Sequence, residues 1–353
     1  MCSVSINNSF KYRNNIRTND NCRCSFMMLG EIGYNNCSDK RYHTLKGLSE
    51  LDNSMDHCIV DQWGVLHDGK VAYKGAIHAL TTLKASNKRI IMLSNSSKRR
   101  LNSIKGLERV GFNVQLFDDI ITSGELAFEQ INSRAYDFLP PKKRKATLKV
   151  VVIGNGEDDD EYIRDCGCEL AKSLDEADFV LVRGMFAIYE GSSNCLNFRV
   201  AEHLLENIQP FLGRCVKHDL RMILSNPDFN RPGSGDPMPG QIGVMYESMG
   251  GVVEYIGKPF AAVYEKCYNT FTLLNEGREI DKHRICGIGD SLEHDIVGAN
   301  NFGITSIFTA NGVHAHDLGT NEGSESLPAA EKVDELLEKL HIRPDIVIPN
   351  FSW

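Results

Sequence analysis

The sequence predicts an α/β fold built around a parallel β-sheet. Short runs rich in Val, Ile and Leu, bounded by Gly, Asn, Ser or Asp, recur along the chain from residue 57 onward. Longer stretches whose apolar residues fit helices separate several of these runs. Strands that read as continuous apolar runs and alternate with helices are typical of a parallel sheet covered on both faces.

The elements follow one another in a regular order. In chain order the expected strands are 57–60, 89–94, 149–154, 178–184, 221–225, 252–257, 284–289 and 305–309. The expected helices are 74–87, 193–208, 259–277 and a last amphipathic helix over 329–342, which the surface loop 319–331 precedes. This alternation supports the α/β class.

The bulk composition excludes several classes of protein. A length of 353 residues is enough for two domains with a buried core. The net charge of −8 argues against a nucleic-acid surface, which usually carries a basic patch. No apolar run approaches the roughly 18 residues that cross a bilayer, so we expect no membrane span.

The cysteines indicate reduced thiols rather than disulfides or zinc. There are 11 of them, an odd number. The pairs Cys22 with Cys24 and Cys166 with Cys168 have C-x-C spacing, which lacks the usual zinc-ligand pattern. No signal-peptide core precedes them. We therefore expect an intracellular, cytoplasmic protein.

Residues 1–45 differ from the rest of the chain. They are rich in Asn, Ser and Arg and show no apolar periodicity. A disordered tail is the expected reading. The alternative is a transit peptide for a plastid or mitochondrion, because the stretch up to Asn19 has no acidic residue. Asp20 and Glu31 weaken this alternative.

Polar side chains follow five of the expected strands. Because ligands of open α/β sheets bind beyond the carboxyl ends of the strands, we expect these side chains to form one site. They are Asp61, Ser94 with Asn95, Asn226 with Asp228, Lys258, and Asp290. Each residue alone could be a turn former, but the set together forms a constellation.

The chemistry of this set predicts phosphoryl transfer. Asp61 and Asp290 would repel each other unless a hard cation such as Mg²⁺ lay between them, and Asp295 is close enough in sequence to turn into the same site. Lys258 supplies positive charge for an anion or keeps a nucleophilic carboxylate ionised. With the hydroxyl of Ser94, the set fits a reaction through an aspartyl-phosphate.

The same residues stand in motifs that resemble those of the haloacid dehalogenase (HAD) superfamily. The resemblance is to its large-cap, NagD-like subclass, which includes p-nitrophenylphosphatase-like and pyridoxal-phosphate phosphatases. The stretch "VDQWGVLHDG" is similar to the first motif, "MLSNSS" to the second, "GKP" to the third and "GDSLEHDI" to the fourth, and "NPD" is a further feature of the subclass. All four motifs occur in the correct order between about Leu45 and His314.

The resemblance implies a role for each residue of the constellation. Asp61 is the expected nucleophile, and Ser94 and Lys258 are expected to act with it on the phosphoryl group. The substrate is expected to lie against Ser94, Asn95, Asn226, Asp228 and Lys258. The expected ligands of Mg²⁺ are Asp61, Asp290, Asp295 and the backbone carbonyl of Trp63.

The resemblance also implies a Rossmann-like parallel-sheet core with an inserted α/β cap domain. The expected division is an N-terminal extension over 1–45, a first core segment over 46–123, the cap over 124–225 and a second core segment over 226–353. In this subclass the cap selects the substrate, so the expected partner is a small phosphorylated metabolite. Members often pair through the cap, and a homodimer is therefore an open alternative.

No residue of the cap identifies that metabolite. Arg183, Arg199 and Arg231 could each meet a second anionic group, although a solvated surface position is expected for each. The acidic run 157–161 is expected to be a solvated turn rather than a metal site, because adjacent carboxylates rarely point at one ion.

Trp63 departs from the pattern of the subclass. Its phosphatases carry an aspartate two residues after the nucleophile, which serves as general acid and base. An indole N–H can donate a hydrogen bond but cannot shuttle a proton, and general acid–base catalysis contributes roughly 10²–10⁴-fold. In a phosphatase, His67, Asp68 or the substrate would then replace the acid, or the leaving group would need little protonation. Otherwise His67 is expected to be an exposed loop residue.

Two other functions stay open. Haloacid dehalogenases carry an aromatic residue at the position of Trp63, in a D-x-Y-G-T-L pattern similar to "DQWGVL", and halide leaves without a proton. Asp290 argues against this reaction, since a dehalogenase has no use for Mg²⁺. The other alternative is a catalytically weak or inactive protein that binds a phosphorylated metabolite. The retained Asp61, Lys258 and Asp290 argue against it.

Overall fold

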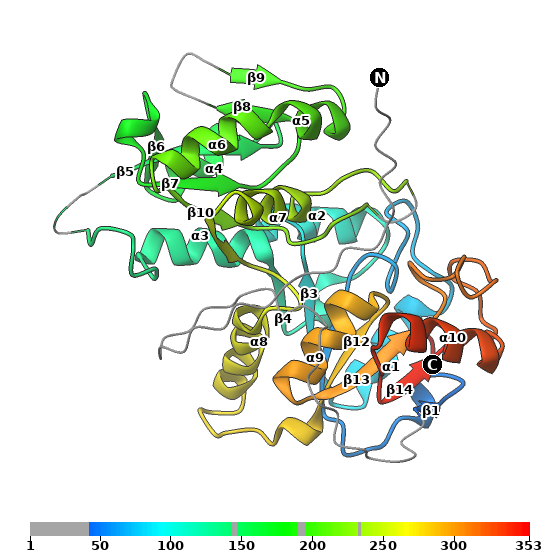
Figure 1. The fold of residues 1–353 in the computed structure, drawn as a ribbon. Helices are drawn as coiled ribbons and strands as arrows, with labels where there is room; N and C mark the ends of the chain where they lie inside the picture. The colour runs from blue at the N-terminus through cyan, green and yellow to red at the C-terminus, as the bar shows by residue number, and fades with distance from the viewer. Residues whose placement is uncertain (1–41, 143, 145–146, 190–194, 232–233) are drawn as a thin grey trace, which may run out of the picture. The chain divides into compact units, whose positions relative to one another are not determined.

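The computed structural model describes residues 42–353, apart from 143, 145–146, 190–194 and 232–233. Within these residues the chain forms two β-sheets, whose strands are labelled in Figure 1. Across this part of the chain, none of the helices has the length and apolar character that crossing a membrane requires. The α/β class predicted from the sequence is confirmed.

The first sheet is parallel throughout and contains the strands that end at the predicted site. Its order is β1 (His43–Thr44), β14 (Ile346–Ile348), β13 (Thr305–Thr309), β12 (Ile285–Gly289), β2 (His57–Val60), β3 (Arg89–Ser94) and β4 (Asp119–Thr122). The chain runs from β2 outward to β4 and later returns at β12, on the other side of β2. This reversal of strand order is where open α/β sheets bind their ligands.

Helices cover both faces of this core sheet. They are α1 (Ala76–Ala85), α2 (Arg100–Arg109), α3 (Ser123–Ser133), α8 (Ala261–Leu274), α9 (Val297–Phe302) and α10 (Ala330–Leu340). Alternate residues of a strand face opposite sides of the sheet. Cys58 and Val60 of β2 accordingly belong to one buried cluster with α1, and Ile59 belongs to another with α8. Burial on both sides explains why β2 reads as an uninterrupted apolar run.

The second sheet is mixed and forms a cap inserted between β4 and β12. Its order is β11 (Val252–Tyr255), β10 (Arg221–Leu224), β7 (Phe179–Val182), β5 (Leu148–Gly154), β8 (Ala187–Tyr189) and β9 (Cys195–Asn197), with β6 (Cys168–Leu170) also paired to β5. Only the pairings of β8 are antiparallel. Its helices are α4 (Asp159–Asp165), α5 (Ala201–Asn207), α6 (Gln209–Lys217) and α7 (Gly240–Ser248).

Short helical turns complete the described structure. The 3₁₀ turns are η1 (Leu48–Glu50), η2 (Val114–Leu116), η3 (Leu174–Glu176) and η4 (Lys282–Arg284), and η5 (Leu292–Ile296) is a π-helical turn. The π-helical turn begins three residues after the end of β12 and contains Asp295. Single π-turns of this kind are frequent at functional sites.

The structure corrects the sequence prediction in several elements. All eight predicted strands are present, but β1, β4, β6, β8, β9 and β14 were not predicted. These strands have two to four residues each, too few to show a period. The helix predicted over 193–208 is wrong in its first part. Cys195–Asn197 forms β9, helix α5 begins at Ala201, and residues 193–194 lie outside the described ranges.

Strand pairings extend across two of the predicted domain boundaries, those after residue 45 and after residue 225. The second sheet continues past the boundary after Ser225, because β11 pairs with β10. The predicted extension 1–45 overlaps the core sheet at its end, where β1 pairs with β14. The rest of that extension, up to residue 41, lies outside the described residues. The division into four segments stays a prediction.

Candidate active site

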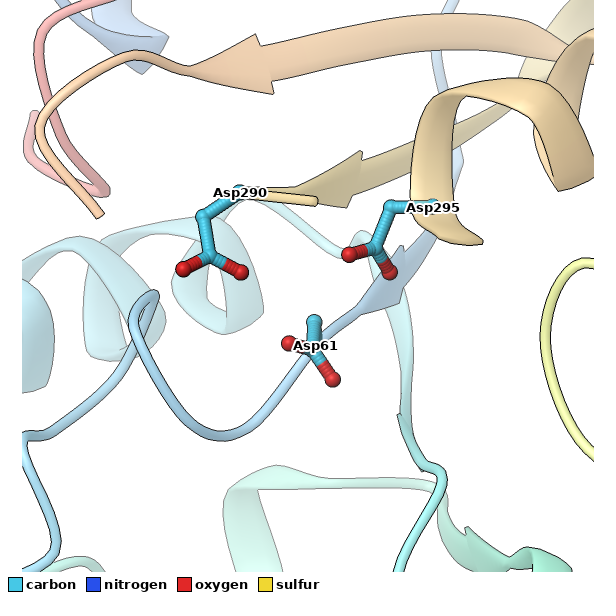
Figure 2. A group of neighbouring side chains, drawn as sticks. All are labelled: Asp61, Asp290 and Asp295. Atoms are coloured by element: carbon cyan, nitrogen blue, oxygen red, sulfur yellow. The ribbon is translucent and has the colours of Figure 1, made fainter. Parts of the chain in front are cut away.

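Three carboxylates converge where the core sheet reverses its strand order. Asp61 follows β2, and its N–H donates to the carbonyl of Ile288 in the neighbouring β12 at 2.9 Å. Asp290 follows β12, and Asp295 lies in η5. Figure 2 shows the carboxylates of Asp61, Asp290 and Asp295 facing a common space. One carboxylate oxygen of each lies within 4.8 Å of those of the other two.

Glycines let the backbone approach these carboxylates. A Cβ on Gly64, whose φ is +78°, would lie 1.8 Å from Oδ2 of Asp290, and a Cβ on Gly312 would lie 2.3 Å from the Cβ of Asp290. The N–H of Val313 donates to Oδ2 of Asp290 at 2.7 Å. Loops after β2 and β13 therefore hold the Asp290 carboxylate in place, and no larger residue fits at Gly64.

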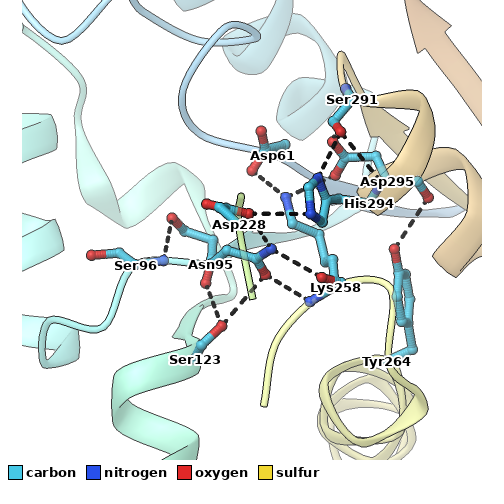
Figure 3. A network of polar contacts seen from close by, with 11 residues as sticks. Asp61, Asn95, Ser96, Ser123, Asp228, Lys258, Tyr264, Ser291, His294 and Asp295 are labelled. Atoms are coloured by element: carbon cyan, nitrogen blue, oxygen red, sulfur yellow. Dashed lines mark hydrogen bonds and ion pairs between the residues drawn. The ribbon is translucent and has the colours of Figure 1, made fainter. Parts of the chain in front are cut away.

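Lys258 joins the carboxylates to the cap side of the site. It follows β11 and is 4% exposed. Its ammonium forms ion pairs with Asp61 and, at 2.7 Å, with Asp295. Its backbone N–H donates to Oδ1 of Asn95 at 2.6 Å. Figure 3 shows this ammonium between the two carboxylates.

Asn95 and Asp228 extend the network across the loops that end β3 and β10. The Asn95 amide donates to Oδ1 of Asp228 at 2.8 Å and to the carbonyl of Lys258 at 3.0 Å. Asn226 acts within its own loop, because its Oδ1 accepts the N–H of Asp228 at 2.9 Å. The structure therefore connects Asn95, Asp228 and Lys258, and Asn226 shapes the turn that presents Asp228.

Ser94 occupies the end of β3, where it was predicted. It is 9% exposed, and its Oγ accepts the N–H of Ser96 at 3.3 Å. Ser123 Oγ donates to the carbonyl of Ser94 at 3.3 Å. Within the described residues, Ser94 makes no hydrogen bond to Asp61 or Lys258.

The charges of the site are unbalanced in the described structure. Burial raises the pKa of Asp61 to about 7, although the Lys258 ammonium lowers it; Asp295 raises it further. Burial and the charges of Asp61 and Asp295 raise the pKa of Asp290 well above its usual range. Burial would lower the pKa of Lys258, but Asp295 and Asp61 outweigh this effect and raise it. Three acids therefore face one fixed cation, an arrangement that favours binding of a further cation.

Two neighbouring residues were missed by the sequence reasoning. His294 lies with Nδ1 2.8 Å from Ser291 Oγ and Nε2 3.6 Å from Oδ1 of Asp228. It stands directly before Asp295 in "GDSLEHDI", and that position was the available signal. Tyr264, buried in α8, donates its hydroxyl to the carbonyl of Asp295 at 3.2 Å. Nothing in the sequence around Tyr264 indicates this contact.

The loop after Asp61 corrects the expectation for His67. This side chain is 5% exposed, so it is not an exposed loop residue. Its Nδ1 accepts the N–H of Gly69 at 2.8 Å, and its Nε2 lies 3.1 Å from the Gln62 amide. Burial, the largest influence, lowers the pKa of His67. Asp68 accepts the N–H groups of Lys70 and Val71, both at 2.8 Å, and so closes a turn.

Trp63 is 42% exposed, although it lies two residues after Asp61. Its ring rests on the backbone of Gly69, where a Cβ would lie 2.3 Å from Cη2 and Cζ3 of the indole. The His67 ring meets it edge-on, with the ring centroids 6.0 Å apart.

The cap contains a second buried ionic cluster that the sequence did not predict. Arg183 and Asp159 are both fully buried, and the Arg183 guanidinium pairs with Asp159 and, at 2.9 Å, with Asp158. The surface position expected for Arg183 is therefore wrong. The solvated turn expected over 157–161 is wrong at Asp159, whereas Glu157, Asp160 and Glu161 are exposed as expected. Arg199 and Arg231 are exposed, as expected.

The described residues include the carboxylates expected to bind Mg²⁺ and one of the two C-x-C cysteine pairs. There, Asp61, Asp290 and Asp295 form the one group of three or more His, Cys, Asp or Glu side chains arranged to hold a metal ion. Cys166 and Cys168 are free thiols outside that group, whereas Cys22 and Cys24 lie beyond the described ranges.

Comparison with known proteins places this geometry in context. Residues 58–169 match the family described as haloacid dehalogenase-like hydrolase, and residues 255–353 match one described as HAD-hydrolase-like. Human chronophin is 26% identical over 258 residues, which cover 71% of this chain and 79% of chronophin.

The fold is also similar to those of solved structures. A hydrolase of the haloacid dehalogenase-like family from Brucella suis 1330 has 25% identity and a TM-score of 0.65, covering 87% of this chain and 99% of its own. The p-nitrophenyl phosphatase from Archaeoglobus fulgidus, at 20% identity and a TM-score of 0.58, shares the fold over 84% of this chain and 97% of its own.

Proposed function

Because the chain belongs to the haloacid dehalogenase-like hydrolases, in the subclass of NagD and the p-nitrophenyl phosphatases, we propose that it is a Mg²⁺-dependent phosphatase. Its substrate class is a small phosphorylated metabolite, and the reaction passes through an aspartyl-phosphate on Asp61. One observation carries the proposal: the Lys258 ammonium bridges Asp61 and Asp295 beside Asp290, at the reversal point of the core sheet. This combines a nucleophile, a cation for phosphoryl oxygens and a metal-binding set.

The donor set fits Mg²⁺. Asp61, Asp290 and Asp295 offer only carboxylate oxygens, the ligands that a hard cation prefers, and the raised pKa values of Asp61 and Asp290 indicate that the cluster lacks positive charge. Asp61, Asp290, Asp295 and the carbonyl of Trp63 are the proposed ligands. When bound, the ion would neutralise phosphate charge and keep these carboxylates ionised. This acidic set also favours phosphoryl transfer over halide displacement, which needs no metal.

In the proposed reaction, each residue of the site has a separate role. The ionised Asp61 carboxylate attacks phosphorus, the bond from phosphorus to the leaving oxygen breaks, and an acyl phosphate forms on Asp61. Water attacks the same phosphorus and releases inorganic phosphate, which restores the carboxylate. Lys258 stabilises the ionised Asp61 and the phosphoryl oxygens, and Ser94 donates its hydroxyl to them. Asn95 and Asp228 position Lys258 and border the substrate.

Proton transfer to the leaving group is the step in which this chain departs from the pattern of the subclass that its motifs resemble. Trp63 occupies the position that supplies the acid in the subclass, and its indole cannot deliver a proton. His67 is an unsuitable replacement, because it is buried, its pKa is lowered by that burial, and both ring nitrogens are already engaged. Asp68 is committed to a turn. The proposed substrate therefore carries a leaving group that needs little protonation, or protonates itself.

The test is hydrolysis of p-nitrophenyl phosphate and of a panel of phosphorylated metabolites, with Mg²⁺ and with EDTA. Wild type should release phosphate only with Mg²⁺, and Asp61→Asn should lose at least about 10³-fold in kcat because its nucleophile is gone. Asp175→Asn is the matched control, because that carboxylate is 83% exposed in the cap and should not affect the rate.

A second variant tests the role of residue 63. Trp63→Asp should increase kcat by about 10- to 100-fold on alkyl phosphates, whose leaving groups need a proton, and little on p-nitrophenyl phosphate. Absence of Mg²⁺-dependent release from every substrate, with wild type folded and binding Mg²⁺, would overturn the phosphatase proposal and favour a binding role.

A further inference from the structure

The exposed indole of Trp63 has no role in the chemistry described above. We propose that its free face stacks on the leaving group of the substrate, so that the preferred class is phosphate monoesters of aromatic and heteroaromatic hydroxyl compounds. The inference rests on the proposed phosphatase function and narrows its substrate class.

The backbone places Trp63 beside the reacting groups. It lies two residues after Asp61 and is bonded to Gly64, whose Cα is in contact with the Asp290 carboxylate. The turn that carries it is closed by the Leu66 N–H donating to the Gln62 carbonyl and the Gly64 N–H donating to the His67 carbonyl, both at 3.0 Å. The backbone that carries the indole is thereby fixed next to the nucleophile and the metal-binding carboxylates.

Within the described residues, Gly69 and His67 support the indole ring. Gly69, with φ of +89°, lets the loop pass directly against the six-membered ring, and a side chain at Gly69 would collide with it. The edge-on His67 ring supports it further, and His67 is itself fixed by Gly69 and Gln62. With its orientation set in advance, the indole loses little conformational entropy when a ligand covers it.

The remaining surface of the indole is left to solvent. Trp63 is 42% exposed and belongs to none of the buried apolar clusters of the described residues. Covering it would bury apolar area, and an aromatic partner would gain further from stacking. Rigid aromatic side chains that are exposed beside polar groups are typical linings of ligand sites.

The chemistry of the leaving group agrees with this placement. A phenolate, or the oxide of a hydroxyl group on a heteroaromatic ring, is a weaker base than an alkoxide. It therefore leaves phosphorus with less need for protonation. With tryptophan in place of a proton donor, general acid catalysis is lost, but an aromatic phosphate ester depends little on it. The indole instead provides a surface that binds the aromatic ring of the substrate. A substrate with an aromatic leaving group would thus explain both the missing general acid and the exposed indole at Trp63.

The test compares binding of phenyl phosphate and cyclohexyl phosphate, which have similar size, to Asp61→Asn with Mg²⁺ by calorimetry. We expect phenyl phosphate to bind about 2- to 10-fold more tightly. Trp63→Phe in that background should keep the preference, and Trp63→Leu should lose it while still binding inorganic phosphate. Because the chain has 2 tryptophans, adding Trp353→Phe leaves Trp63 as the only one, and phenyl phosphate should change its fluorescence.

Equal affinity for the two esters, a preference that persists in Trp63→Leu, or unchanged Trp63 fluorescence at saturation would overturn this inference. Wild-type hydrolysis, measured in parallel, separates it from the proposed function. If wild type hydrolyses phenyl and cyclohexyl phosphate with Mg²⁺ but Trp63→Leu keeps their rate ratio, only the role of Trp63 fails. If wild type hydrolyses no ester, the phosphatase proposal fails.

Discussion

The protein buries charge in two places, and the two clusters differ in what surrounds the charges. In the core, Asp61, Asp290 and Asp295 share one cation, Lys258. In the cap, Asp158 and Asp159 share Arg183. Both clusters carry more acid than base. Buried charge alone therefore does not distinguish a functional site from a structural one.

The surroundings of the cap cluster stabilise its buried acid, Asp159. Asp159 accepts the N–H groups of Asn155 at 3.2 Å and Gly156 at 2.7 Å, and it lies in the first turn of α4, where the helix favours a negative charge. The Arg183 guanidinium lies over the ring of Tyr162, 4.3 Å from its centroid, although its Nε and Nη2 have no hydrogen-bond partner among the described residues. Arg183 and Asp159 are closed to solvent, whereas the Asp158 side chain is 31% exposed.

The pKa directions reflect the same difference. Burial would raise the pKa of Asp158, but the hydrogen bond and charge of Arg183 outweigh it and lower that pKa. In the core, burial raises the pKa of Asp61 to about 7 despite Lys258. A raised carboxylate pKa beside other acids indicates missing positive charge. This missing charge is the property that marks the core cluster as the site.

We expect the largest effect on kcat from removal of the Lys258 ammonium in the core cluster. Lys258→Met should reduce kcat by about 10³-fold, because no cation would then oppose protonation of Asp61 or bind phosphoryl oxygens. The free energy of unfolding should change much less than kcat, since the carboxylates can take up protons. Phosphate release and urea unfolding measure the two quantities. Near-wild-type kcat in a folded Lys258→Met protein would contradict the assignment of the core cluster as the site.

The matched change in the cap should have the opposite outcome. Arg183→Met leaves the fully buried Asp159 without its cation, so we expect a loss of about 3–5 kcal/mol in the free energy of unfolding, measured in urea. Among molecules that stay folded, kcat should remain within about 3-fold of wild type. Arg231→Met is the control, because Arg231 has a 47% exposed side chain beside Asp236 and should cost under about 0.5 kcal/mol.

Equal losses of stability in Arg183→Met and Arg231→Met would show that the cap cluster contributes no net stability. A selective loss of kcat in Arg183→Met, with stability unchanged, would instead make Arg183 part of the substrate site. Either result would remove the distinction between the two clusters.

The sequence predicted the core site better than the cap cluster for a physical reason. Asp61 and Asp290 directly follow apolar strands, and the geometry of a parallel sheet brings such ends together without any knowledge of loops. Arg183 and Asp159 meet because β7 and α4 pack within the cap, and their spacing in the sequence carries no such signal. For this reason both were expected in solvent.

The same limit explains the smaller errors. The burial of His67 depends on how its own loop folds back on Gly69, which composition does not reveal. His294 was missed because its partner Asp228 belongs to a loop far away in the sequence. The predicted strands were found because burial on both faces leaves an apolar run, whereas short strands such as β9 leave none.

The two clusters should also respond to pH with opposite signs. An unfolded Asp ionises near pH 3.9, whereas folded Asp61 does so near pH 7. Between these values the folded state binds more protons, so the contribution of Asp61 to stability is present at low pH and is lost as pH rises to about 7. The loss is at most about 1.4 kcal/mol for each pH unit. Asp158, whose pKa is lowered, contributes stability at higher pH and loses it as pH falls below about 4.

Urea unfolding of wild type and Asp61→Asn in EDTA, from about pH 4.5 to 8, measures this contribution as the difference between the two curves. That difference should decline towards pH 7 and then level off. Mg²⁺ should stabilise wild type most above pH 7, where the Asp61 carboxylate is ionised, and should stabilise Asp290→Asn less. A difference independent of pH would mean that Asp61 ionises as readily in the fold as in the unfolded chain. In that case the core cluster would have no missing charge for a metal ion to supply.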